Sequence, residues 1–249
     1  LRRARRRVTT DLDDPRVPEP VAEGGNPGVS AEQAQSYRAL ARAMDDLSES
    51  LRTGRAGVNF LIYGKPGTGK SELARVLAAD VGASAFEIAS ENEDGNLLDG
   101  ERRLRALRAS QSLMRPQQTL LVFDEAEDVF RESTSGLRSG AAQSHKAWMN
   151  RVLESNRIPT IWITNAIDDL DPAFARRFDG VVELNVPPRA QRMRLVERYA
   201  GDMVSASDAH RLADCTGVTP AWLFVLTFAW QVGAGLSATQ MALMCVPIA

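Results

Sequence analysis

One glycine-rich stretch, Gly64-Lys65-Pro66-Gly67-Thr68-Gly69-Lys70-Ser71, constrains the fold of this chain more than any other feature. It fits the pattern GxxxxGK[ST] and lies between an apolar run over residues 58–63 and a predicted helix over residues 70–80. Glycines let such a loop turn its backbone N–H groups toward phosphate oxygens, and the following helix adds the positive end of its dipole. We therefore predict a phosphate-binding loop for ATP, in which Lys70 reaches the β- and γ-phosphates and Ser71 is a ligand of Mg²⁺. A plain glycine turn between strand and helix is the alternative.

Strands and helices are predicted to alternate on both sides of this loop. The expected strands are 58–63, 85–88, 119–123, 160–164 and 181–184, and the expected helices are 30–53, 70–80, 101–114 and 141–155. Such alternation predicts an α/β fold of the P-loop NTPase type, with a parallel sheet between helices. After Pro187 and Pro188, helices near 191–199 and 208–213 predict a small helical lid that is incomplete in this sequence. The expected division is a disordered basic, Pro- and Gly-containing linker over 1–29, the α/β ATPase domain over 30–187, and the partial lid over 188–249.

Polar residues follow the predicted strands where such folds bind ligands. Asp124 and Glu125 come directly after the apolar run 120–123, which suits Asp124 to the Mg²⁺ shell and Glu125 to orienting or deprotonating the attacking water. Asn165 closes the strand 160–164, where its amide would meet the γ-phosphate or the lytic water. Each of these residues alone is more often an ordinary turn residue.

A short helix is predicted from Asp171 as N-cap and Pro172 as first residue, and the paired Arg176 and Arg177 follow it. Taken alone, the two arginines would be a solvated basic face.

The order of these elements resembles that of AAA+ ATPases, and their details resemble the AAA clade proper. The matching details are an apolar run ending in Asp-Glu, Thr164-Asn165, and Asp171-Pro172-Ala173-Phe174-Ala175-Arg176-Arg177-Phe178-Asp179 before an edge strand. The resemblance runs from about residue 58 to residue 199. It implies a sensor-1 role for Asn165 and arginine-finger roles for Arg176 and Arg177, which would reach ATP bound by the next subunit. It therefore also implies a ring, commonly a hexamer.

Three segments depart from the family pattern or leave its function open. The stretch 93–101, where related remodelling enzymes carry an aromatic that grips polypeptide, contains only Leu97 and Leu98 as large apolar residues. The stretch 219–223, where many AAA+ proteins carry a sensor-2 arginine, has none. The stretch 215–249 carries no charged residue, and it is interpreted as buried lid helices, as a damaged or out-of-frame tail, or as a membrane or partner-binding segment.

Charge and cysteine content limit the kinds of partner, metal site and cellular compartment that we expect for this chain. The formal net charge of −2 gives the whole chain no general attraction for nucleic acid or anionic membranes. Five of the first seven residues are Arg, which reads as either a nucleic-acid-binding arm or a solvated lead-in. The two cysteines and two histidines do not support a disulfide framework or a zinc site. We expect a cytoplasmic protein with no membrane partner.

The sequence thus predicts a homo-oligomeric AAA+ ATPase that couples hydrolysis of Mg²⁺-ATP to the remodelling of a partner macromolecule, most directly a protein or an adaptor. Two other interpretations stay open. One is a loader-like ATPase that acts on nucleic acid through the Arg-rich start. The other is a regulatory module that binds nucleotide and turns it over little.

Overall fold

The computed structural model describes residues 31–92, 94–131, 139–168, 170–200, 204–215, 217, 219–221 and 223. The predicted linker over 1–29, with its arginines, and most of the charge-free stretch 215–249 lie outside these residues. No helix in the part described has the length and apolar character needed to cross a membrane.

The centre of the fold is a five-stranded sheet in the order β2-β3-β4-β1-β5. All four strand pairs are parallel, so the predicted parallel sheet is confirmed. The strands are β1 (Asn59–Tyr63), β2 (Ser84–Glu87), β3 (Thr119–Phe123), β4 (Thr160–Thr164) and β5 (Gly180–Glu183). Because parallel strands end at the same edge, the segments that follow β1, β3 and β4 meet there.

The helices are α1 (Ala31–Thr53), α2 (Lys70–Asp80), α3 (Gly100–Leu113), α4 (Glu127–Arg131), α5 (Ser139–Ser155), α6 (Pro172–Ala175), α7 (Arg189–Ala200) and α8 (Ala206–Asp214). A 3₁₀ turn, Pro116–Gln118, precedes β3. The predicted N-cap of α6 is present, because the Asp171 side chain accepts a hydrogen bond from the Ala173 amide. The short α4 and the 3₁₀ turn are not among the helices that the sequence predicts, since both are shorter than two turns of helix and carry little periodic pattern.

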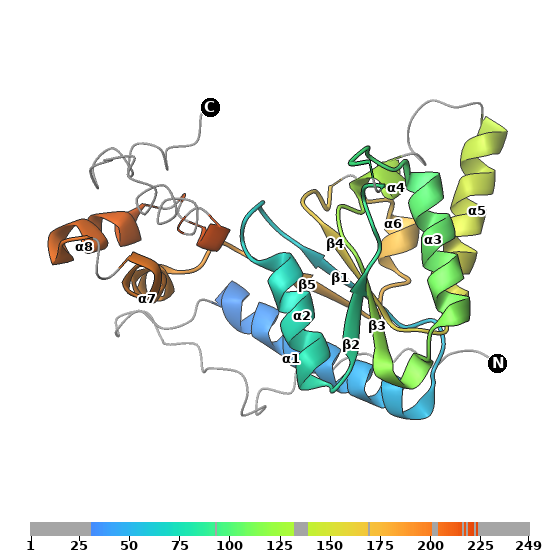
Figure 1. Ribbon diagram of the computed structural model, residues 1–249, viewed down its shortest axis with the longest axis horizontal. Helices are drawn as coiled ribbons and strands as arrows, with labels where there is room; N and C mark the ends of the chain where they lie inside the picture. The colour runs from blue at the N-terminus through green and yellow to red at the C-terminus, as the bar shows by residue number, and fades with distance from the viewer. Residues whose placement is uncertain are drawn as a thin grey trace.

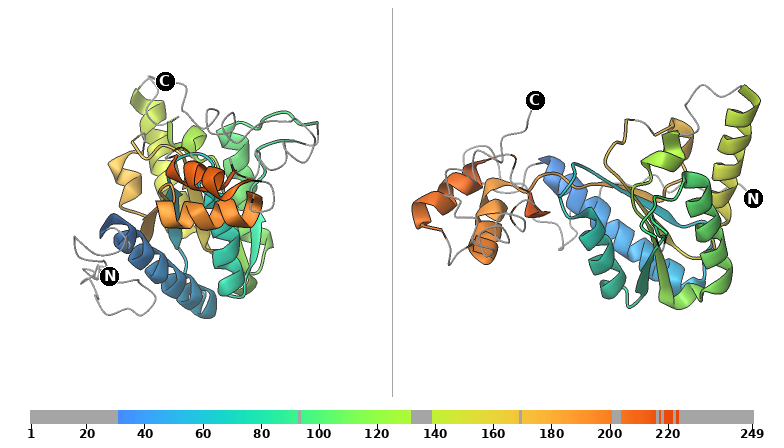
Figure 2. Two further views of the ribbon diagram at one scale, coloured as in Figure 1. Left: turned by 90° about the vertical axis from the view of Figure 1, so that its left-hand side faces the viewer. Right: turned by 45° about the horizontal axis from the view of Figure 1, so that its top comes forward.

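Helices cover both faces of the sheet, as Figures 1 and 2 show. Side chains along each strand alternate between two apolar clusters, as the two-residue period of a strand requires. Phe60, Leu120 and Ile161 pack with α1 and α2, whereas Leu61, Leu121 and Trp162 pack with α3, α4, α5 and α6. The sheet is therefore buried on both sides, which explains the continuous apolar runs of β1, β3 and β4.

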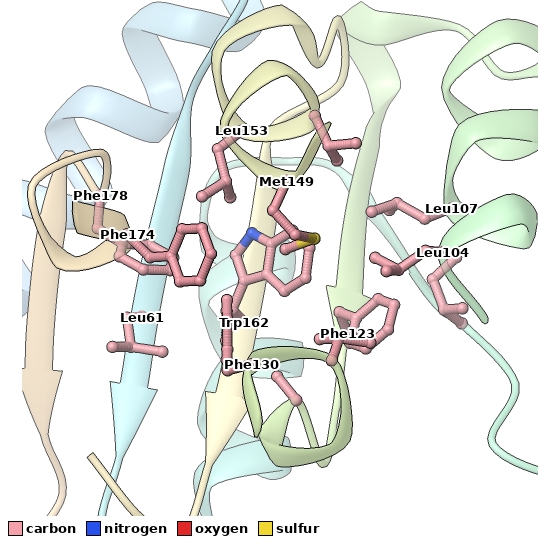
Figure 3. Packing of buried hydrophobic residues seen from close by; sticks show 14 of the residues in the cluster. Leu61, Leu104, Leu107, Phe123, Phe130, Met149, Leu153, Trp162, Phe174 and Phe178 are labelled. Carbon is pink, nitrogen blue, oxygen red and sulfur yellow. The ribbon is translucent and has the colours of Figure 1, made fainter. Parts of the chain in front are cut away.

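Trp162 of β4 lies at the centre of the second cluster (Figure 3). Its ring stacks on Phe123 with centroids 4.9 Å apart and lies 5.7 Å from the ring of Phe130. The Trp162 indole N–H donates to Asn59 Oδ1 over 3.1 Å, so this buried polar atom is satisfied. The packing joins β3, β4 and α4 rigidly just below the edge where these strands end.

Helices α7 and α8 pack against each other beyond β5 and form a smaller apolar cluster of their own (Figure 1). It consists of Val196, Ala200, Ala209, Leu212 and Leu223. Arg192 of α7 fastens it by donating to the carbonyls of Ala213 and Pro187. The position of these helices after the sheet fits a lid, and we propose that residue 188 begins it.

Candidate functional site

The glycine-rich loop joins the end of β1 to the start of α2 and has the backbone that only glycines accept readily. Gly67 has φ +76°, and Gly69, the N-cap of α2, has φ +95°. Gly64 lies so close to the main chain after β5 that a Cβ there would stand 2.2 Å from the Leu184 carbonyl oxygen. The loop therefore needs glycine for two separate reasons, left-handed backbone and close approach.

Lys70 is the first residue of α2, and its ammonium group is buried at the base of the loop, with the residue only 6% exposed. Lys70 Nζ donates to the carbonyls of Gly64 and Lys65 over 2.8 and 3.0 Å, and to Asn165 Oδ1 over 2.7 Å. Burial lowers the pKa of Lys70 from its usual value, and the nearby Asp124 and Glu127 carboxylates partly oppose this. A buried cation with fixed oxygen contacts is prepared to receive an anion.

Ser71 and Asp124 meet directly, although they are separated by 53 positions in the chain. Ser71 Oγ donates to Asp124 Oδ2 over 2.5 Å, and Asp124 Oδ1 accepts from the Glu125 amide over 2.8 Å. A hydroxyl and a carboxylate side by side are the protein ligands that Mg²⁺ takes together with phosphate oxygens. The structure thus brings together both predicted metal ligands at the start of α2.

Glu125 is exposed beside this pair, and its backbone has φ +51°. It is the one residue other than glycine with positive φ in the part of the chain that the structure describes. A left-handed backbone at a glutamate is unfavourable and persists only where neighbouring contacts hold it.

Asn165 follows β4 and is held from two sides. Its side-chain Oδ1 accepts a hydrogen bond from Lys70, and its backbone N–H donates to Glu127 Oε1 over 2.5 Å. The other carboxylate oxygen of Glu127 is buried, with no hydrogen-bond partner among the described residues. Glu127 is a site residue that sequence reasoning missed, because an acidic residue in the first turn of a short helix is also an ordinary helix start.

Arg176 and Arg177 lie away from the loop. Asp179, two residues after Arg177, accepts a hydrogen bond from the amide of Asn59 at the start of β1, whereas the loop follows the other end of that strand. A five-residue strand such as β1 separates these two levels by about 13 Å. Arg176 is exposed, while Arg177 pairs with Glu154 over 3.0 Å and donates to the Ala173 carbonyl. The structure therefore groups the other predicted site residues but not these two.

A pocket of about 450 Å³ opens beside the loop, between the sheet edge and α7. Its size falls within the range of small-molecule sites. Its lining surface is mainly apolar. The lining residues are Leu40, Thr68, Leu73, Val182, Glu183, Leu184, Asn185, Val186, Pro187, Pro188, Gln191, Arg194, Leu195, Arg198 and Pro220. No local sequence pattern predicts this pocket, since its walls come from four segments that are distant in the chain.

Two of the stretches that depart from the family pattern, 93–101 and 219–223, lie largely within the described residues. Leu97 is 78% exposed on a turn in which the Asn92 side chain accepts from the amides of Asp94 and Asn96. Thr219 and Ala221 lie against the tip of the glycine-rich loop, where the Ala221 amide donates to the Gly67 carbonyl over 3.3 Å. The segment that lacks a sensor-2 arginine thus contacts the loop through its backbone and a threonine.

Arg103 of α3 is a second residue that sequence reasoning missed. Its side chain is 3% exposed and donates to the carbonyls of Asp124 and Glu125. No spacing in the sequence singles it out, because Arg108 lies one and four residues from the same two leucines, Leu107 and Leu104, and is nevertheless exposed.

Comparisons with known proteins found matches to the sequence and to the fold. The model of the family described as "ATPase family associated with various cellular activities (AAA)" matches residues 60–186. An ATP-dependent zinc metalloprotease FtsH 3 of Sphaerobacter thermophilus is 33% identical over 186 residues, which cover 68% of this chain and 36% of the relative. A spastin of Anopheles gambiae is 29% identical over 198 residues, covering 76% of this chain and 24% of the relative.

Among solved structures, the FIGL-1 AAA domain in complex with ADP superimposes with a TM-score of 0.57 at 18% identity, covering 84% of this chain and 82% of that one. At 18% identity, this match supports the fold alone. The chain spans about a quarter to a third of the length of the curated relatives given above.

Proposed function

This chain belongs to the AAA family of ATPases, and we propose that it hydrolyses ATP to ADP and phosphate and uses the energy to remodel a partner macromolecule, most directly a protein. The observation that carries the proposal is the convergence of Lys70, Ser71, Asp124 and Asn165 at one edge of the sheet. Three segments that are far apart in sequence bring a buried cation, a hydroxyl–carboxylate pair and a polar side-chain amide to one place.

Nucleotide binding follows from the loop and the pocket next to it. Backbone N–H groups of Gly67 to Ser71 and the N-terminus of α2 supply positive ends for the phosphates, and Lys70 supplies a full charge. A phosphate oxygen that accepts from Lys70 can take over one of its three present contacts. The apolar pocket beside Thr68 and Leu73 is the place for the base, because it continues from the loop.

The residues present also fit a magnesium ion. Mg²⁺ is usually held by one or two protein oxygens together with substrate phosphates, and Ser71 Oγ with Asp124 Oδ2 provides such a pair. No cluster of three or more His, Cys, Asp and Glu side chains suited to a metal occurs among the described residues, so a self-sufficient protein cage is not what the fold offers there. When bound, Mg²⁺ would neutralise phosphate charge as the terminal phosphoryl group leaves.

Hydrolysis would rely on Glu125 and Asn165. Glu125 is exposed at the end of β3, free to accept a proton from, or to orient, the attacking water. Asn165 stands 2.7 Å from Lys70 Nζ, so it lies next to the position that a terminal phosphate would take. The backbone N–H of Asn165 is held by the Glu127 carboxylate, and this contact keeps the Asn165 residue at this place.

The two arginines support an oligomer. Because Arg176 and Arg177 lie near the opposite end of β1 from the loop, they are badly placed to reach nucleotide in their own subunit. We propose that Arg176, which is exposed, reaches the nucleotide of a neighbouring subunit in a ring of six, and that Arg177 supports the segment through its ion pair with Glu154.

A protein is the favoured partner, because the relative FtsH 3 is named as an ATP-dependent metalloprotease. The exposed Leu97 turn offers an apolar contact on the surface.

The experiment that tests the proposed function measures ATP hydrolysis per subunit over a range of protein concentrations, together with sizing in ATP and without it. We expect the rate per subunit to rise steeply as ATP-dependent assembly begins, and we expect Glu125→Gln to bind ATP without turning it over. A monomer that binds ATP tightly with a flat, near-zero rate would instead make the chain a nucleotide-binding regulatory module. Normal turnover in Glu125→Gln would remove the mechanism.

A further inference from the structure

Arg103 contacts the segment that carries the catalytic carboxylates at four points. Its Nη2 donates to the Asp124 carbonyl, and its Nη1 donates to the Glu125 carbonyl over 3.1 Å. The same Nη1 pairs with Asp128 Oδ2 over 3.0 Å, and the guanidinium lies 4.4 Å from the centre of the Phe123 ring. One side chain from α3 thus holds the main chain on both sides of the turn that ends β3.

A simple stabilising ion pair does not explain this arrangement. Burying a guanidinium is unfavourable unless its donors are satisfied, and Arg103 Nε has no partner among the described residues. The Asp128 side chain is still 36% exposed, so this pair alone returns little of that energy. The contacts that distinguish Arg103 are those to the two carbonyls, and a planar fork of donors suits two neighbouring acceptors.

The carbonyls that Arg103 holds belong to the two residues whose side chains the proposed reaction needs. Glu125 has the left-handed backbone described above, which requires neighbouring contacts to persist. Its amide is held by Asp124 Oδ1 and its carbonyl by Arg103. With the amide and the carbonyl both held, the direction in which the Glu125 Cα–Cβ bond leaves the main chain is fixed as well.

We propose that Arg103 is a positioning residue for ATP hydrolysis: by clamping the Asp124 and Glu125 carbonyls, it aims the Glu125 carboxylate at the attacking water without touching the nucleotide. This inference rests on the proposed ATPase activity. It assigns Arg103 to the chemical step and not to nucleotide binding, since the loop, Lys70 and the base pocket make none of the contacts given for it.

The test compares Arg103→Lys with Arg105→Ala, a control on the exposed face of the same helix, where Arg105 pairs with Glu101. A lysine keeps the charge but lacks the fork, so it cannot hold both carbonyls in the same way. We expect Arg103→Lys to bind a fluorescent ATP analogue within about twofold of the wild type, while kcat falls about 100-fold, the loss typical of a misplacement near 1 Å. Arg105→Ala should leave both quantities unchanged.

Hydrogen–deuterium exchange of the nucleotide-free protein supplies a readout that does not depend on turnover. We expect Arg103→Lys to raise exchange in peptides that cover residues 124–129 and to leave β1 at wild-type protection. Exchange raised throughout the domain, with nucleotide affinity lost together with kcat, would make Arg103 merely structural and overturn the proposal.

The two proposals fail in different ways. Wild-type kcat in Arg103→Lys, measured beside an active wild-type protein, would overturn the positioning role alone. A wild-type protein that hydrolyses no ATP at any concentration would overturn the proposed function, and the positioning role with it.

Discussion

Replacing Glu125 by glycine should stabilise the fold relative to replacing it by alanine, although both changes remove the proposed catalytic base. A left-handed backbone costs an L-residue about 1–2 kcal/mol, and Glu125 has φ +51°. Glycine avoids this strain but loses about 0.5–1 kcal/mol more backbone entropy on folding than alanine does. Since the Glu125 side chain is exposed, neither change removes buried contacts. Taking the midpoints of these two ranges, the net advantage of Glu125→Gly over Glu125→Ala should be about 0.75 kcal/mol.

The assay is urea unfolding of the two nucleotide-free variants, supported by melting temperatures that should differ by about 1–4 °C. Arg105, in the middle of α3, provides the control: Arg105→Gly should be less stable than Arg105→Ala by about 1 kcal/mol, because its backbone is helical. A Glu125→Gly variant that is less stable than Glu125→Ala would show that the turn after β3 is not strained, and the reasoning about its clamping by Arg103 would lose its basis.

Three further predictions concern the loop and α6. Lys70→Met should weaken ATP binding by about 10- to 150-fold, because a charge-assisted hydrogen bond contributes about 1.5–3 kcal/mol; calorimetry checks this, and an unchanged affinity would contradict it. Gly64→Ala should destabilise the domain by about 1–3 kcal/mol in urea unfolding, since its Cβ would stand 2.2 Å from the Leu184 oxygen; wild-type stability would show that the loop can move away. The Lys146 ammonium, followed by the Ala173 amide, lowers the pKa of Asp171. Because the folded pKa lies below the unfolded one, the stability advantage of the wild type over Asp171→Asn should be complete above about pH 4 and shrink as the pH falls below that, and an advantage that does not change between pH 7 and pH 3 would count against the ion pair.

Much of the fold could be predicted because its elements carry local patterns. The runs that form β1, β3 and β4 are apolar throughout, since both faces of the sheet are covered, and their predicted bounds agree with the structure to within one residue. The parallel arrangement then predicts that the segments after β1, β3 and β4 meet, and Lys70, Asp124 and Asn165 do lie together. The roles of these residues in ATP hydrolysis stay predictions.

The rest of the site depends on contacts that no local pattern reveals. Arg103 is one of four arginines between residues 102 and 108, and only the packing of α3 decides which of them is buried. Glu127 becomes a site residue because the Asn165 amide, 38 positions away, donates to it. The base pocket likewise requires α1, the loop, the end of β5 and α7 to be placed in space.

The central claim is that each active site is completed by an arginine of the neighbouring subunit, and mixing two inactive variants tests it most directly. Arg176→Ala keeps Glu125 but cannot complete a neighbour's site, whereas Glu125→Gln lacks its own base but still offers Arg176. In randomly mixed rings about a quarter of the sites would combine an intact Glu125 with an intact neighbouring arginine. We predict that each variant alone is nearly inactive and that ATP hydrolysis in the mixture clearly exceeds the sum of the two. A mixture no more active than its components, with co-assembly shown by sizing, would contradict the shared site.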